Sequence, residues 1–228
     1  MNNKGLSGNQ LKLIAMLCMT VDHVGYILLP RIQILRIIGR LAFPIFAYMI
    51  AEGCRYTRSM GKYLTGLLIS GFVCQAVYWT AMRSLYMCIM VTFSLSVGLI
   101  WLIRLAEERK TVTACIAVAA GTLLAFFATE ILPDLLRGTD YGVDYGFVGV
   151  MLPVTVYPCK KRWQQLAVMT LMLSLLALDG IYVQWYGLAA LPLLALYGGH
   201  RGKWKLKWMF YIYYPVHLAV IWLLHMVN

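Results

Sequence analysis

The sequence has few charged residues and very few acidic ones. Only 13% of its 228 residues are charged and nine are acidic, whereas 61% are hydrophobic. The mean hydropathy is accordingly positive, at +0.73. A soluble domain of this length needs a more polar surface than these residues can supply. The shortage of charge therefore excludes a soluble domain and predicts an all-α polytopic membrane protein.

Other absences exclude further classes. The six cysteines lie singly and without CxxC spacing, so neither a zinc site nor a disulfide framework is expected. The net charge of +11 forms no continuous basic stripe or tail, so we expect no nucleic-acid partner. The first apolar run lacks a small-residue cleavage site, which argues against a removable signal peptide. No polar linker is visible, and residues 1–228 are predicted to form a single transmembrane domain.

Long apolar runs fill the chain. A membrane-spanning helix needs about 20 predominantly apolar residues. Nine runs approach this length, and they cover residues 10–30, 34–54, 62–81, 86–104, 112–132, 142–158, 164–179, 181–199 and 207–227. Only Asp179 and Gly180 separate the seventh run from the eighth, so the seventh and eighth runs could form a re-entrant pair of helices. The sequence therefore predicts about nine spans, within a range of eight to ten.

Basic residues gather in alternate loops. Fifteen of the 20 lysines and arginines lie before or early in the first run, or after the second, fourth, sixth and eighth runs. Cytoplasmic loops of membrane proteins carry such an excess of Lys and Arg. The pattern predicts a cytoplasmic N-terminus, an odd number of spans and an external C-terminus.

The first run contains two adjacent ionisable residues, Asp22 and His23, in the stretch CMTVDHVGYILLP. A charged side chain inside a membrane costs several kcal/mol unless it is paired or wetted, so such residues mark candidate functional sites. Adjacent helix residues point about 100° apart, so the two side chains reach one site only if it is a wide cavity between helices. The alternative is a hydrogen-bonded pair that locks helix packing.

The second run contains Arg36 and Arg40 in LRIIGRLAFPIFAYMIAEGCRYTR. Their spacing places both side chains on one helix face, and Pro44 is expected to kink the helix beyond them. Arg36 could instead extend to the outer headgroups. Arg40 lies one turn deeper and is expected to face Asp22 or a bound anion.

Three further ionisable residues are candidates for supporting roles. Glu52 marks the inner end of the second run, and Asp144 lies at the outer start of the sixth. His217 follows Pro215, which is expected to break the last helix, although His217 could also be an ordinary buried histidine. We expect one buried polar layer to bring together Asp22, His23, Arg40, Asp144 and His217.

Four stretches, LKLIAMLCMTVDHVGY, LRIIGRLAFPIFAYMIAEGCRYTR, DYGFVGVMLPVTVYP and WMFYIYYPVHL, occur in an order that resembles the TraX family of conjugal-transfer membrane proteins. The founding role of that family is N-terminal acetylation of pilin. The family in turn resembles a wider group of transmembrane acyltransferases that includes the acyltransferase-3 proteins. The resemblance implies a multi-pass protein of the bacterial cytoplasmic membrane.

The resemblance also implies an activity. In the wider group, cytoplasmic acyl-CoA donates an acyl group to an acceptor on the opposite side, and an intramembrane histidine is essential. That histidine would be His23 here, with Asp22 beside it and with Arg36 and Arg40 as the buried arginines. The resemblance transfers no role to Glu52 or His217.

Acyl transfer from acetyl-CoA needs a base and a group that stabilises the oxyanion. We expect His23 to be the base, with its charge state tuned by Asp22, and Arg40 or Arg36 to hold the oxyanion or balance Asp22. Basic residues on the inner side could bind the CoA phosphates, although cytoplasmic loops carry such residues in any case. They are Arg55, Arg58, Lys62, Lys160, Lys161 and Arg162. The acceptor could be a pilin-like peptide, an envelope glycan or a small amine.

Two other classes use the same features. A proton-coupled transporter needs buried ionisable groups, but the chain shows no inverted repeat of the kind found in many transporters. A structural subunit of a conjugation apparatus needs only the packing role of these residues. A transporter would move substrate without consuming acetyl-CoA, and a structural subunit would do neither.

Overall fold

The computed structural model describes residues 5–178, 182–203 and 207–227. The junction at Asp179 and Gly180, and the basic residues Lys4 and Lys205, lie outside the described residues, as do the side chains of Lys207 and Trp208. Within the described ranges the structure contains helices, two isolated β-bridges and no strand. The prediction of an all-α fold is confirmed.

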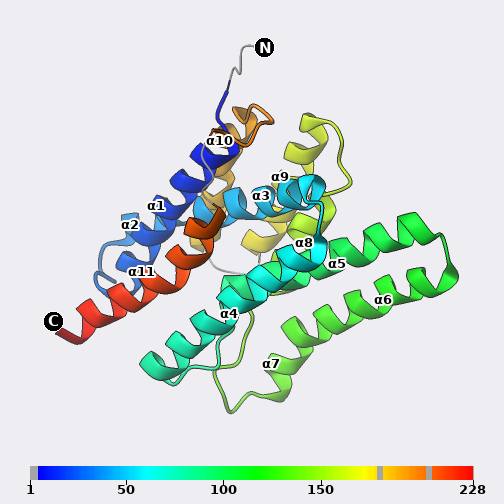
Figure 1. Ribbon diagram of the computed structural model, residues 1–228. Coiled ribbons are helices and arrows are strands. Elements are labelled where there is room, and N and C mark those ends of the chain that lie inside the picture. The colour runs from blue at the N-terminus through cyan, green and yellow to red at the C-terminus, as the bar shows by residue number, and fades with distance from the viewer. Residues whose placement is uncertain (1–4, 179–181, 204–206, 228) are drawn as a thin grey trace. The chain divides into compact units, whose positions relative to one another are not determined.

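The helices follow the predicted apolar runs in order (Figure 1). Their bounds are α1 (Gly8–Ile27), α2 (Gln33–Gly39), α3 (Ala42–Tyr56), α4 (Met60–Met82), α5 (Ile89–Arg109), α6 (Val112–Phe126), α7 (Leu132–Leu135), α8 (Gly146–Val156), α9 (Arg162–Leu178), α10 (Leu191–Ala195) and α11 (Lys207–Val227). A π-helical turn, Phe127–Ile131, joins α6 to α7. A 3₁₀ helix, Tyr182–Ala190, leads directly into α10.

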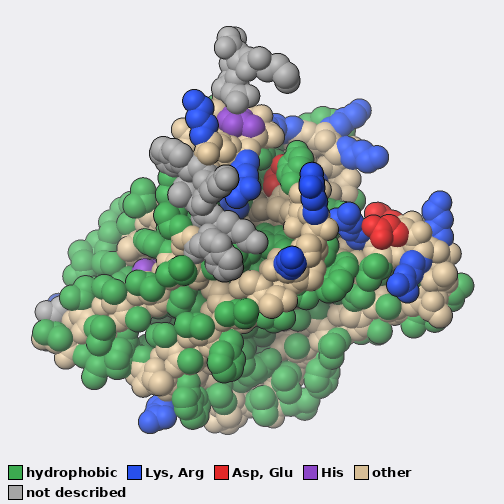
Figure 2. All heavy atoms as spheres, viewed as in Figure 1, with side chains coloured by type: hydrophobic (Ala, Val, Ile, Leu, Met, Phe, Trp, Pro, Cys, Tyr) green, Lys and Arg blue, Asp and Glu red, His purple; other side chains and the backbone are tan. Residues whose placement is uncertain are grey.

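Five helical segments in the described ranges are long and apolar enough to cross a membrane. They are Gln33–Tyr56, Met60–Met82, Ile89–Arg109, Val112–Leu135 and Met209–Val227. Many of their exposed side chains are hydrophobic, as Leu123 and Leu124 of α6 illustrate at 68% and 67% exposure, and Figure 2 shows hydrophobic side chains over much of the visible face. Such surfaces suit lipid tails. The chain is an all-α membrane protein, and its nine spans and orientation stay predictions.

The chain forms two compact units. Met1–Met49 and Cys159–Asn228 make up the first, and Ile50–Pro158 makes up the second, so the border falls within α3. In the first unit α1 packs against α2 and α11, and α9 packs against the 3₁₀ helix. In the second unit α5 packs against α4, α6 and α8. The prediction of one functional domain over residues 1–228 is not tested by this division.

Two prolines have different effects. The second apolar run is interrupted at Arg40 and Leu41, between α2 and α3. Pro44 accounts for the position of the break, because a proline ring clashes with the carbonyl group four residues earlier, which here belongs to Arg40. The last run, by contrast, continues as one helix, α11, with Pro215 inside it. The prediction that Pro215 breaks this helix is wrong, and His217 lies on regular helical backbone.

Loops of the second unit are tied together by a carboxylate. Asp140 Oδ1 accepts a hydrogen bond from the Leu85 amide at 2.9 Å, and the Met87 amide donates to the Gly142 carbonyl at 2.7 Å. Hydrogen bonds from the Ser84 hydroxyl and the Leu85 amide hold the pKa of Asp140 below its ordinary value of 3.8. The charged carboxylate is therefore the form that holds the two loops together.

We expect this loop contact to weaken in acid. Because the folded-state pKa of Asp140 is lowered, its contribution to stability is present above pH 3.8 and is lost as the pH falls through the lowered value. Limited proteolysis of the segment 83–88 over this range should show increasing cleavage in the wild type. Asp140→Asn keeps an acceptor oxygen but cannot titrate, so an equal acid response in this variant would contradict the assignment.

Candidate functional site

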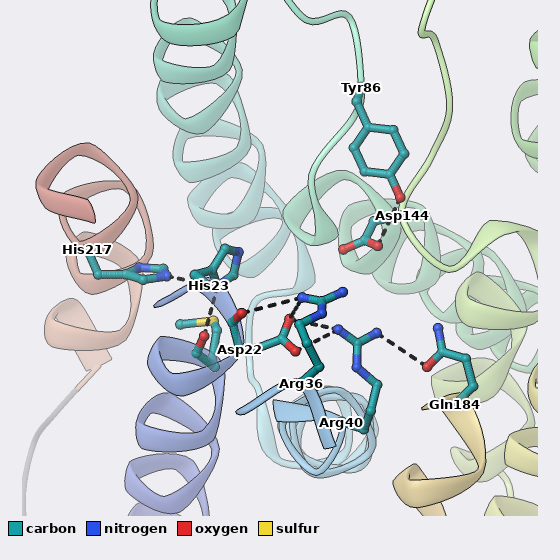
Figure 3. A network of polar contacts seen from close by, with 9 residues as sticks. Asp22, His23, Arg36, Arg40, Tyr86, Asp144, Gln184 and His217 are labelled. Atoms are coloured by element: carbon teal, nitrogen blue, oxygen red, sulfur yellow. Dashed lines mark hydrogen bonds and ion pairs between the residues drawn. The ribbon is translucent and has the colours of Figure 1, made fainter. Parts of the chain in front are cut away.

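In the first unit, a carboxylate is clamped by two guanidinium groups (Figure 3). Arg36 Nη1 donates to Asp22 Oδ2 at 2.7 Å, and Arg40 Nη2 donates to both carboxylate oxygens at 2.7 Å. The Asp22 and Arg40 side chains are only 14% and 9% exposed, and that of Arg36 is 30% exposed. Of the two predicted partners of Arg40, Asp22 or a bound anion, the structure shows Asp22. Two cations on one anion leave a net positive charge.

Glycine makes this clamp possible. A Cβ atom on Gly39 would overlap the Asp22 carboxylate, so only glycine lets α2 approach α1 this closely. Gly25 of α1 has the same effect one turn later, since a Cβ there would lie 2.6 Å from the Leu35 Cβ. The amide oxygen of Gln184 in the 3₁₀ helix lies 3.4 Å from Arg40 Nη1. Arg40 is thus held from two sides.

His23 contacts another histidine and makes no hydrogen bond to Asp22. Its Nδ1 lies 2.8 Å from the Met19 carbonyl oxygen and 3.4 Å from His217 Nε2 (Figure 3). The two rings meet edge to face, with centroids 4.9 Å apart. His217 Nδ1 in turn lies 3.0 Å from the Tyr213 carbonyl oxygen. Asp22 and His23 therefore use different faces of α1, as neighbouring helix residues must.

These contacts assign the tautomer of each neutral histidine. A carbonyl oxygen can only accept, so Nδ1 carries the hydrogen in both rings and Nε2 carries the lone pair. The His23 Nδ1–H group donates to the Met19 carbonyl and also approaches His217 Nε2. His23 Nε2 points away from His217 (Figure 3) and makes no hydrogen bond to any described residue. Its lone pair is therefore not used by any described residue.

Two hydroxyl groups connect the same helices one turn away. The Thr20 and Tyr213 hydroxyls lie 2.5 Å apart, and Thr20 also donates to the Met16 carbonyl at 3.0 Å. Tyr213 must then be the donor to Thr20. The Tyr213 ring stacks on His217 with an interplanar angle of 11°. Sequence reasoning missed both residues, although each precedes a candidate histidine by three or four positions and so shares its helix face.

Arg36 and Arg40 differ in how their hydrogen-bond donors are used. Arg40 is committed to Asp22 and Gln184. Arg36 uses only Nη1, for the Asp22 carboxylate and its backbone carbonyl, and its guanidinium lies over the Tyr26 ring at 4.9 Å. Among the described residues, the Nε and Nη2 groups of Arg36 donate to no acceptor. Of the two predicted oxyanion donors, Arg36 retains free hydrogen-bond donors.

Asp144 and Glu52 belong to the second unit. Asp144 Oδ1 accepts from the Tyr86 hydroxyl at 3.1 Å, and its backbone carbonyl accepts from Thr92 at 2.6 Å. The predicted convergence of Asp144 with Asp22 and His23 stays a prediction. Glu52 is 5% exposed and forms an ion pair with Arg55 of the same helix.

The inner basic residues fall into two groups. Arg55 donates to the carbonyls of Val156 and Tyr157 at the end of α8, and Arg162 donates to that of Ala195 at the end of α10. Cations at helix C-termini satisfy carbonyls that have no intrahelical partner. The side chains of the other four residues predicted to bind CoA phosphates are exposed: Arg58, Lys62, Lys160 and Lys161. In the described part of the chain, no group of three or more His, Cys, Asp or Glu side chains could hold a metal ion.

The apolar helices and the ionisable groups between them define the class, an all-α integral membrane protein with a polar centre. The family model described as TraX protein matches residues 7–225. The chain belongs to the TraX family.

Two relatives extend this comparison. The chain is 26% identical, over 96% of both proteins, to the probable fimbrial assembly protein FimC, serogroup H1, of Dichelobacter nodosus. It is 32% identical to an uncharacterised protein of Rickettsia prowazekii (strain Madrid E), over 42% of this chain and 36% of that one. No solved structure matches the chain.

Proposed function

We propose that the protein is an integral membrane acetyltransferase of the bacterial cytoplasmic membrane. It would move an acetyl group from cytoplasmic acetyl-CoA to an amine or hydroxyl acceptor at mid-membrane or on the outer face. The single observation that carries this proposal is the pairing of a free basic nitrogen, His23 Nε2, with an arginine on the neighbouring helix that retains free donors, Arg36. Membership of the TraX family, whose founding role is pilin acetylation, supports it.

His23 acts as general base in the proposed reaction. Its Nε2 takes the proton from the acceptor as the acceptor oxygen or nitrogen bonds to the thioester carbonyl carbon. The carbonyl oxygen becomes an oxyanion in the tetrahedral intermediate. When the intermediate collapses, the carbon–sulfur bond breaks, and the imidazolium returns the proton to the CoA thiolate. No oxidant or metal is needed for this balance.

Arg36 and Arg40 have different electrostatic roles in the proposed reaction. Arg36 donates to the developing oxyanion, for which its Nε and Nη2 groups are free among the described residues. Arg40 neutralises Asp22, and Asp22 holds both guanidinium groups in place. The net positive charge of the three groups favours a transition state that carries negative charge. Arg58, Lys62, Lys160 and Lys161 are the proposed partners of the CoA phosphates.

Binding of acetyl-CoA tests the proposal most directly. A ligand that binds only the folded protein stabilises it by about 2.7 kcal/mol at 100 times its dissociation constant. Thermal unfolding of purified protein in nanodiscs should therefore shift upward with acetyl-CoA and much less with inorganic phosphate. A transporter or structural subunit has no reason to respond, so an unchanged transition would contradict the proposal.

Arg36→Gln is expected to slow thioester cleavage about 10²- to 10³-fold, as the loss of one oxyanion donor does in other enzymes. The measurement is release of the CoA thiol from acetyl-CoA by protein in nanodiscs, with native membrane extract as acceptor. Arg31→Gln is the matched control, because Arg31 is exposed and lies outside the clamp. Equal rates for the two variants would remove Arg36 from the mechanism.

One observation favours a second candidate, a structural role in pilus assembly. The Dichelobacter nodosus relative is named a probable fimbrial assembly protein and matches over nearly its whole length. A purely structural subunit should tolerate loss of the base, so pilus formation by cells that carry His23→Ala separates the two candidates. Normal pili without acetyl transfer would favour the structural role.

A further inference from the structure

The two histidines occupy unequal positions. His23 Nε2 has no hydrogen-bond partner among the described residues, whereas His217 Nδ1 donates to the Tyr213 carbonyl and His217 Nε2 faces His23 Nδ1 at 3.4 Å. His217 is also the more enclosed residue, at 7% exposure. We infer that His217 is a positioning residue that orients His23 and accepts its Nδ1–H group when His23 is protonated during acyl transfer. This inference rests on the proposed function.

Protonation of His23 during the reaction explains why an acceptor at His217 matters. Once His23 takes a proton on Nε2, both of its nitrogens carry hydrogen and Nδ1–H becomes a stronger donor. The Met19 carbonyl accepts that hydrogen along the helix, and the lone pair of His217 Nε2 provides an acceptor from a second helix. Nucleophile-activating bases are commonly oriented by a third group, often a carboxylate. Here that place is taken by a neutral imidazole.

The nearby carboxylate is committed elsewhere. The carboxylate oxygens of Asp22 accept hydrogen bonds from Arg36 and Arg40. Among the described residues, Asp22 makes no hydrogen bond to either histidine. It therefore acts on His23 only through space, against the opposing charges of the two arginines. The hydrogen-bonding partner that α11 supplies carries no charge.

The position of His217 is itself fixed by neighbouring groups. The Tyr213 ring stacks on it, the Tyr213 carbonyl accepts from Nδ1, and the edge-to-face ring of Tyr214 lies 5.2 Å away. The Tyr213 hydroxyl then anchors this turn of α11 to Thr20 of α1. The hydroxyl pair and the histidine pair connect the same two helices at successive turns. Together they set the distance between His23 and its acceptor.

The test compares three replacements of His217 in the full-length protein in nanodiscs. His217→Gln keeps an acceptor oxygen and should retain activity within about threefold, whereas His217→Phe keeps the size and removes the acceptor. We expect the phenylalanine variant to lose about tenfold or more, a part of the about 10²- to 10⁴-fold that a general base contributes. The activity of both variants is measured as release of the CoA thiol from acetyl-CoA, with native membrane extract as acceptor.

The third variant gives a readout that a merely structural role would not move. In His217→Glu a carboxylate faces His23, whose other charged neighbours are Asp22, Arg36 and Arg40. A nearby opposite charge stabilises the imidazolium form and typically shifts a pKa by about 1 to 3 units. The midpoint of the acidic limb of the pH–rate profile should therefore rise by about one unit or more. An unmoved midpoint, or equal rates for the glutamine and phenylalanine variants, would overturn the inference.

Two controls separate this inference from the proposed function. Val216→Ala changes the exposed neighbour of His217 on the same helix and should behave as wild type. Circular dichroism and size-exclusion profiles show whether each variant is folded. If wild type shows thiol release that depends on His23 while His217→Phe equals it, only the positioning role fails. If wild type shows no such release, the proposed function fails, and the positioning role falls with it.

Discussion

Replacement of His23 by alanine is expected to lower acetyl transfer by about 10²- to 10⁴-fold, the range that a general base supplies. In the described part of the chain, His23 is the histidine that has Asp22, Arg36 and Arg40 as charged neighbours and a ring nitrogen, Nε2, without a hydrogen-bond partner. The side chain of His23 is partly buried, and the variant loses one hydrogen bond to the Met19 carbonyl and the ring contacts to His217 and Tyr214. Stability and insertion should change little, while transfer of labelled acetyl groups to native acceptors should nearly disappear.

His225 provides the matched control for this experiment. It lies exposed in the last turn of α11, and His225→Ala should keep the wild-type rate. Retention of more than about half the wild-type rate by His23→Ala would eliminate His23 as the base. Incubation with labelled acetyl-CoA but no acceptor adds a second result. Label that stays covalently on wild type and not on His23→Ala would show that His23 acts as a nucleophile instead.

The second large effect concerns stability. Asp22→Ala removes the carboxylate that neutralises Arg36 and Arg40, and Arg40 is only 9% exposed. Removing one partner of a buried ion pair typically costs about 3 to 5 kcal/mol, because the remaining charge is left without compensation. The free energy of unfolding in detergent should fall by about this amount. Activity should fall as well, since Arg36 loses the group that holds it.

A surface ion pair of the same chemistry supplies the comparison. Asp134 and Arg137 lie 3.5 Å apart with side chains 71% and 79% exposed. Exposed pairs contribute about 0 to 1 kcal/mol, so Asp134→Ala should barely shift the unfolding transition. Similar losses for Asp22→Ala and Asp134→Ala would show that the clamp does not stabilise the first unit. Asp22→Asn, which keeps the shape and an acceptor oxygen, should fall between Asp22→Ala and wild type.

The sequence predicted the helices well because length and hydropathy decide them. The apolar runs correspond in order to helical segments, and Arg40 contacts Asp22 as its depth suggested. The sequence also predicted that His23 and His217 share one buried polar layer, and the structure does bring them together. That the two rings contact each other directly could not be predicted in the same way. Asp22 is adjacent to His23 in sequence but points to another face of α1, whereas His217 arrives from 194 residues away. Such long-range pairs depend on packing that hydropathy does not encode.

The local details that shape the site were also hidden from sequence reasoning. Pro44 and Pro215 look alike in the sequence, yet a break precedes Pro44 while α11 continues through Pro215. Gly39 carries no visible signal in an apolar run, although its missing side chain makes room for Asp22. The role of a proline or glycine depends on which neighbour occupies the space beside it. That neighbour becomes known only with the fold.

The clamp has a consequence for biogenesis. Among the described helices, α1 is not one of those apolar enough to count as a membrane span by composition, and it carries Asp22. The compensating charges, Arg36 and Arg40, emerge from the ribosome 14 and 18 residues later. An isolated α1 would expose an uncompensated carboxylate to lipid, which is costly. The first two apolar segments should therefore leave the translocon together, as a helical hairpin whose ion pairs form before either helix meets the bilayer alone.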